Sequence, residues 1–281
     1  MPDRRWLQFS LRTCMGVMLG VGVLSSWVAY QIRQVRAQQF AAAEITKLGG
    51  TAMQCHLIES NEGWRAHCPQ RLREMLGQEF FTTINYVSLE SPAFTDKELA
   101  LLRAFPELNS LTLRQSTITD DGLSILPSLP RLEGFTATGA NITDRGLRHL
   151  RQLPNLDFLN LDSTQITDAG LAEIGQISKL YSLNIAHTPI TDAGIARLAN
   201  LSRLRYLTLD ATQITDQALR DLDRFPELEQ LSLNDTQITD TGLTHLHSRT
   251  TLRSLSLEKT GVTDTGVEAL QQALPKLKVD R

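Results

Sequence analysis

The sequence is short of aromatic residues, of cysteine and of net charge. Aromatic residues make up 6% of its 281 residues, three residues are cysteine, and 28 Lys and Arg nearly balance 31 Asp and Glu. The low cysteine count excludes a small disulfide-rich scaffold. The balanced charge disfavours a nucleic-acid binder that depends on bulk positive charge, so we predict no nucleic-acid partner. With 41% hydrophobic residues, the chain is also too apolar to be disordered.

A 24-residue repeat organises the chain from about residue 84 onward. The tripeptide Ile-Thr-Asp recurs at this interval from Ile118 to Ile238, with related tripeptides at Phe94 and Val262. From Leu156, the unit reads Leu-x-x-Leu-x-Leu-x-x-Thr-x-Ile-Thr-Asp-x-Gly-Leu-x-x-Ile-x-x-Ile. Its Leu-x-Leu alternation predicts a short strand, and the later apolar spacing of three predicts a helical turn. One unit cannot bury its own apolar stripe, so we expect the units to stack as coils.

This unit resembles the leucine-rich repeat. The resemblance implies an α/β fold over residues 84–281, a curved solenoid with a parallel sheet on the concave face and short helices on the convex face. Residues 51–83 do not follow the period and are predicted to form an N-terminal cap, and residues 273–281 a C-terminal cap. An N-terminal apolar segment followed by such repeats resembles membrane-anchored leucine-rich repeat proteins of bacteria, and this resemblance brings no enzymatic activity with it.

Single columns of the repeat have predicted roles of their own. The threonine column, represented by Thr164, is expected to hydrogen-bond the neighbouring turn backbone. The Thr-Asp pair is expected to cap each helix, a local role that makes a calcium ladder unnecessary. The glycine column, represented by Gly170, indicates close packing between coils. Arg249 occupies an apolar position, so its coil is expected to open locally or to turn the guanidinium toward solvent.

An uncharged run of twenty residues, from Thr13 to Ile32, predicts a transmembrane helix. A helix of that length spans about 30 Å, the thickness of a bilayer core. Trp27 and Tyr30 lie at its far end, where amphipathic rings favour the membrane interface. A cleaved signal peptide is the alternative interpretation.

The segments around this run predict a signal-anchor layout. Residues 1–12 form a short tail, and residues 33–50 form a juxtamembrane helix or stalk that ends at Gly49-Gly50. Basic residues are equal in number on the two sides of the run, so orientation is weakly encoded. The layout favours a single-pass membrane protein with the bulk of the chain outside the cytoplasm, on the periplasmic side.

Catalytic and metal-binding motifs are not apparent. Cys55 and Cys68 enclose a 14-residue segment, and either a disulfide worth about 3 kcal/mol or two free thiols is compatible with this spacing. Their histidine neighbours match no standard zinc spacing. Phosphate-binding, dinucleotide-binding and metalloprotease motifs do not occur, and the scattered histidines pair with no nucleophile. We therefore predict no enzyme, no cofactor and no metal.

The concave face is the predicted binding surface. Strand alternation places polar and aromatic side chains there, and the candidate residues are Phe158, Asn160, Asp162, Asn184, Tyr206, Asp210, Asn234 and Glu258. Aromatic rings beside acids and amides are typical of an interface hot spot, and the acidic excess favours a basic partner. We predict a membrane-tethered module that recognises a protein, a peptide or a glycan. The alternative is a structural or adaptor membrane protein whose concave face has no dedicated ligand.

Overall fold

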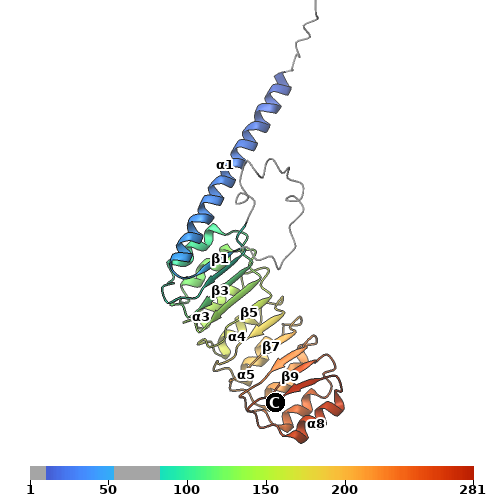
Figure 1. Cartoon of the computed structure of the whole chain (residues 1–281). Helices are drawn as coiled ribbons and strands as arrows, with labels where there is room; N and C mark the ends of the chain where they lie inside the picture. The colour runs from blue at the N-terminus through green and yellow to red at the C-terminus, as the bar shows by residue number, and fades with distance from the viewer. Residues whose placement is uncertain (1–10, 54–82) are drawn as a thin grey trace, which may run out of the picture. The chain divides into compact units, whose positions relative to one another are not determined.

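The computed structural model describes residues 11–53 and 83–281. The chain divides into two compact units, one of residues 1–41 and 57–82 and the other of residues 42–56 and 83–281. Helix α1 runs from Leu11 to Lys47 as one continuous element of 37 residues (Figure 1). The predicted span and stalk are therefore not separate helices.

The membrane prediction is wrong. Among the described residues, no helix is long and apolar enough to cross a membrane. The run from Thr13 to Ile32 is uncharged, and glycine, serine, threonine and glutamine lie among its apolar residues. The transmembrane helix and the single-pass, periplasmic localisation are corrected on this finding.

Helix α1 ends at Lys47, just before Gly49 and Gly50. Gly49 has a φ of +88°, in the left-handed region that favours glycine. Its N–H donates to the carbonyl of Thr46 at 3.0 Å, and the N–H of Gly50 donates to the carbonyl of Ile45 at 2.9 Å. These bonds satisfy the last carbonyls of α1 and end the helix, as a glycine C-cap does.

The end of α1 and a short strand cover the first coil. Strand β1 (Thr51–Met53) pairs antiparallel with β2 (Tyr86–Leu89). Ile45 is buried, and a side chain at Gly50 would collide with the Phe94 ring and the Ser88 carbonyl. Part of the N-terminal cap is thus built from residues 45–53. The remainder of the predicted cap, including the Cys55–Cys68 pair, lies outside the described residues.

The repeats form a parallel sheet in which strand order follows the chain. Each strand pairs with the equivalent residues 24 positions further on, for example Phe158 with Ser182. After β2 come β3 (Ser110–Arg114), β4 (Gly134–Thr138), β5 (Phe158–Asn160), β6 (Ser182–Asn184), β7 (Tyr206–Thr208), β8 (Gln230–Ser232), β9 (Ser254–Ser256) and β10 (Lys278–Asp280). The last of these, β10, lies in the predicted C-terminal cap and covers the edge of β9.

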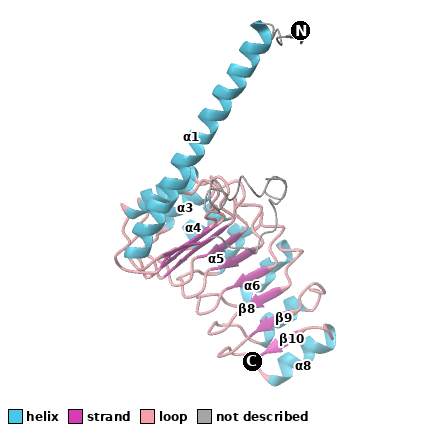
Figure 2. Ribbon diagram, turned by 45° about the horizontal axis from the view of Figure 1, so that its top comes forward, coloured by secondary structure: helices cyan, strands magenta, loops and turns pink. Residues whose placement is uncertain are grey.

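Short helices alternate with the strands and lie along one side of the sheet (Figure 2). They are η2 (Glu98–Ala104), η3 (Gly122–Ser128), α3 (Asp144–Leu150), α4 (Asp168–Ile174), α5 (Asp192–Ile195), η4 (Ala196–Leu198), α6 (Asp216–Asp221), η5 (Leu222–Arg224), α7 (Asp240–Leu243), η6 (Thr244–Leu246) and α8 (Asp264–Ala273). Strand and helix leucines meet between the two layers, as the full burial of Leu159 and Leu171 shows. The predicted solenoid, with its parallel sheet and short helices, is confirmed.

The threonine column binds the turn backbone as predicted. The Oγ1 of Thr164 donates to the carbonyl of Leu161 at 2.6 Å, and Thr188, Thr212, Thr236 and Thr260 make the same bond three residues back. Ser116 stands in this column, but its buried hydroxyl has no hydrogen-bond partner.

The aspartate column does not cap its own helix, contrary to the prediction. Threonine is the N-cap, and the aspartate that follows it accepts two bonds from the threonine of the next coil. Asp168, for example, accepts from the N–H of Thr191 at 2.8 Å and from its Oγ1 at 2.6 Å. The glycine column leaves room for this carboxylate, because a Cβ at Gly194 would lie 2.3 Å from Asp168 Oδ1. The predicted close packing at glycine is thus confirmed and explained.

Arg249 is neither solvated nor a site of local opening. Its side chain is 11% exposed, one guanidinium nitrogen donates to the carbonyl of Phe225, and another lies 3.6 Å from Asp223 Oδ1. Both partners belong to the preceding coil. The cost of burying the charge is offset by hydrogen bonds that the sequence pattern does not reveal.

Candidate binding surface

The face of the sheet turned away from the short helices, here called the open face, carries one row of aromatic side chains. The first residues of successive strands pair in one continuous register from β2 to β9. We call the first six of them, from β2 to β7, the aromatic row: Tyr86, Ser110, Gly134, Phe158, Ser182 and Tyr206. Large rings at β2, β5 and β7 therefore alternate with small residues, which leaves gaps between the rings.

Phe158 is the most exposed ring of this row, at 41%. Its partners in the adjacent strands are Gly134 and Ser182, so no bulky side chain stands beside it on the row. Complete burial of a fully exposed phenylalanine side chain is worth about 1.5–3 kcal/mol, and the exposed part of the Phe158 ring forgoes a share of this. This exposed ring is the feature most typical of a binding surface.

Tyr206 packs against a residue that the sequence analysis missed. Tyr181, just before β6, is 38% exposed, and its ring meets that of Tyr206 edge-to-face with centroids 4.9 Å apart. The Arg205 guanidinium lies 5.9 Å from the Tyr181 ring centroid. A hydrogen bond between the two tyrosine side chains is the main cause of the raised pKa of Tyr181. A 24-residue alignment of the repeats could have found Tyr181, since the other residues of its column are polar: Asn85, Asn109, Glu133, Asp157, Arg205, Glu229 and Arg253.

The predicted amide residues lie at open-face positions, but their side-chain oxygens accept hydrogen bonds from the backbone of the protein itself. Asn160 accepts the N–H of Asp162, and Asn184 accepts that of Ala186, both at 3.0 Å. Asn234 accepts the N–H of Glu258 from the next coil at 2.7 Å. These bonds fix the chain where it leaves each strand, so the three amides are less available to a partner than the rings.

Two of the three predicted acidic residues are also engaged by neighbouring groups of the fold, and the third is exposed. Asp210 accepts bonds from the hydroxyl of Ser232 at 2.6 Å and from the N–H of Asn234 at 2.8 Å. Asp162 Oδ1 lies 2.8 Å from His187 Nδ1. Glu258, in contrast, has an exposed side chain. Among the predicted residues, Phe158 and Glu258 therefore have the freest side chains.

Two further carboxylates flank the row beside Phe158. Glu133 and Asp157 directly precede β4 and β5, and their coils are adjacent. Burial is the main cause of the raised pKa of both carboxyls, and the nearby Asp157 charge raises the pKa of Glu133 further. Across the described residues, neither carboxylate forms an ion pair. The Arg131 charge lowers the pKa of Glu133 and the Arg203 charge lowers that of Asp157, but neither arginine is within ion-pair distance of these carboxylates.

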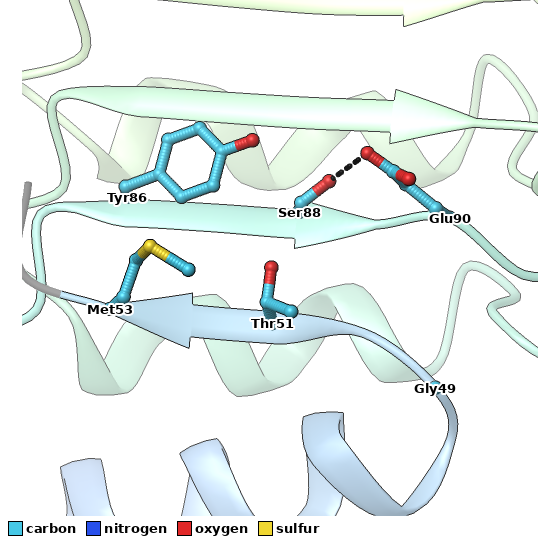
Figure 3. A pocket seen from close by; sticks show the side chains of 6 residues that line it. All are labelled: Gly49, Thr51, Met53, Tyr86, Ser88 and Glu90. Carbon is cyan, nitrogen blue, oxygen red and sulfur yellow. Dashed lines mark hydrogen bonds between the residues drawn. The ribbon is translucent and has the colours of Figure 1, made fainter.

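A shallow pocket of about 330 Å³ lies at the β1 end of the open face (Figure 3). Met53 and Tyr86 supply its apolar wall, and Ser88 donates a hydrogen bond to Glu90 at 2.7 Å across its far side. Gly49 and Thr51 complete the lining. Because Tyr86 belongs both to this pocket and to the aromatic row, the two are continuous.

Nothing in the described part of the chain gathers three or more His, Cys, Asp or Glu side chains into a metal site. The described side chains that stand out on the open face are aromatic and acidic.

Comparison with known proteins identifies the repeats. Residues 152–175, 176–199, 227–246 and 249–270 match the sequence profile of the leucine-rich repeat family. No curated protein matches the sequence. The predicted resemblance to leucine-rich repeat proteins is confirmed for these repeats, while membrane anchoring finds no support.

Solved structures of the same fold come from bacteria. Internalin C2 of Listeria monocytogenes is 25% identical, with a TM-score of 0.55 over 70% of this chain and 80% of that one. Another internalin of that organism is 24% identical, with a TM-score of 0.50 over 65% of this chain. The match spans 56% of that internalin's length. A leucine-rich repeat domain is in general a protein-interaction module.

Proposed function

We propose that this chain is an interaction module that binds a polypeptide partner on the open face of its sheet, through the aromatic row. The observation that carries the proposal is the 41% exposure of Phe158 between two small neighbours. Tyr181, directly before Ser182, and Tyr206, in the next strand, extend the same apolar surface. Covering these rings would recover burial energy that the free protein lacks.

The rest of the open face supports this proposal by its rigidity. Asn160, Asn184 and Asp210 are held by hydrogen bonds to the backbone of their own or the next coil. A partner therefore meets a surface that does not need to be ordered on binding, which lowers the entropic cost of association.

The proposal is tested by selecting random-sequence peptides on the intact chain and measuring their affinity for variants. Phe158→Ser and Tyr206→Ser should each weaken selected peptides by about tenfold or more, as truncation of a hot-spot ring does. The control variants Gln230→Ala and Ser254→Ala continue the same row beyond Tyr206 and should bind as the native chain does. Peptides that bind all four variants equally, or a selection that enriches none, would overturn the proposal and favour a module without a ligand on this face.

A further inference from the structure

The charge around Phe158 narrows the class of partner. Glu133 and Asp157 lie in adjacent coils, close enough that the charge of Asp157 acts on Glu133. Two carboxylates that repel each other favour any cation placed between them. In the coils that follow, by contrast, Arg205 already pairs with Glu227 at 3.2 Å and with Glu229 at 3.4 Å.

The repeat places Glu133 next to Phe158. Tyr181 precedes Tyr206 by 25 residues in the chain, and their rings are in contact. Glu133 precedes Phe158 by the same 25 residues and occupies the equivalent place in its coil. Asp157 directly precedes Phe158 in the chain, and the N–H groups of both residues donate to the carbonyl of Glu133, at 2.9 and 3.1 Å. Each of the two coils thus has one carboxylate directly before its strand, at the end of the strand where the exposed ring stands.

A ring elsewhere on the solenoid, Tyr181 in the column of Glu133 and Asp157, already has a guanidinium group beside it. One coil further on, the Arg205 guanidinium lies over the Tyr181 ring while its nitrogens contact two glutamates. Ring and carboxylates together are the usual surroundings of a bound guanidinium or ammonium group. At Phe158 the ring and the carboxylates are present, and no cation of the described chain pairs with either carboxylate.

We propose that the aromatic row receives an extended peptide whose lysine or arginine side chain lies on the Phe158 ring, between the carboxylates of Glu133 and Asp157. This inference rests on the proposed function and names the chemistry of its partner. The small residues Gly134 and Ser182 leave both sides of the ring open to the aliphatic part of such a side chain.

The dimensions of the row suit a short segment that crosses the strands. From β2 to β7 there are five strand spacings, or about 24 Å in total. An extended chain covers that distance with about seven residues. A peptide of this length would contact Tyr86, Phe158 and Tyr206, with its cationic residue near the middle.

The experiment uses the same peptide selection on the intact chain, followed by matched substitutions on both sides of the interface. Selected peptides should be enriched in lysine or arginine at one position, and replacing that residue by norleucine should weaken binding about tenfold. Glu133→Gln and Asp157→Asn should each weaken the cationic peptide about threefold and leave the norleucine peptide unchanged. Glu268→Gln removes one charge from α8 and should change neither affinity.

Two controls separate this inference from its alternatives. Higher salt should weaken the cationic peptide more than the norleucine peptide. Because the Glu133 charge is unfavourable in the folded chain, Glu133→Gln should not lower the thermal unfolding temperature, so that lost binding is not lost folding. Peptides that require Phe158 but show no basic residue and ignore both carboxylate variants would overturn the cation site while the proposed function stands. The loss of all dependence on Phe158 would overturn both.

Discussion

At the scale of single residues, a left-handed backbone position recurs in every coil from β3 to β9. The φ angle is positive at seven positions spaced by 24 residues: Gln115, Gly139, Ser163, His187, Ala211, Asp235 and Lys259. At most of them the N–H donates to the next coil, as Ala211 does to the carbonyl of Asn234 at 2.8 Å. The conformation therefore contributes to stacking, although six of the seven residues are not glycine.

This column supplies a matched pair of substitutions. Ala211→Gly should raise the free energy of unfolding by about 0.5 kcal/mol, because the strain of a left-handed alanine exceeds the extra entropy lost by glycine. Gly139→Ala should lower it by about the same amount. A Cβ at Gly139 would meet nothing within 4 Å, so only backbone strain is tested. Urea denaturation measures both effects, and a destabilised Ala211→Gly variant would contradict the argument.

At the scale of elements, the junction between neighbouring coils is a two-point hydrogen bond from threonine to aspartate. Seven aspartates, from Asp96 to Asp240, accept both the N–H and the Oγ1 of the threonine 23 residues later. The first coil has no earlier aspartate to use. There Glu98 accepts from the N–H of Thr95 at 2.8 Å and from its Oγ1 at 2.5 Å, so a carboxylate within the coil replaces the missing one.

Removing one acceptor should loosen one junction. In Asp168→Asn, the amide can still accept the N–H of Thr191, but its NH₂ group cannot accept the hydroxyl. We expect a loss of about 1–2 kcal/mol in the free energy of unfolding. Asp264→Asn is the control, since Asp264 is 93% exposed and contacts Arg281 rather than a threonine. Equal stability of the two variants in urea would show that the junction contributes little.

At the scale of the whole molecule, the sequence predicts the features that depend on spacing within a single coil, such as which leucines are buried. Strand leucines such as Leu159 and helix residues such as Leu171 reveal their burial by spacing alone. The partners of Asp168 and Arg249 lie in another coil, and local patterns do not show which groups face each other across a junction. For the run from Thr13 to Ile32, a lack of charge predicts a membrane helix, and no such helix is found among the described residues.

The candidate site was predicted in part for the same reason. Alternation correctly placed Phe158 and Tyr206 at open-face positions of their strands. It could not show that Asn160 and Asn184 are engaged by the backbone, or that Tyr181, outside its strand, would meet Tyr206 from the preceding coil.

Two carboxylates that accept hydrogen bonds from threonine, Asp240 and Glu98, should make the solenoid sensitive to acid. Hydrogen bonds from Thr263, its side chain first, lower the pKa of Asp240, and the Thr95 side chain lowers that of Glu98. A carboxyl whose pKa is lower in the folded chain adds stability above its unfolded pKa, about 4, and this stability is lost as the pH falls through the folded value. Glu133 and Asp157, with raised pKa values, oppose the trend only partly.

We therefore expect the free energy of unfolding in urea to decline below about pH 4. Because each coil is held by its neighbours, loss of one junction weakens the solenoid as a whole. Asp240→Asn should be less stable than the native chain at neutral pH, and the two should converge as the pH falls through the lowered pKa of Asp240 and its carboxyl becomes protonated. A stability difference that stays constant through that range would mean that the charge of Asp240 contributes nothing to the junction.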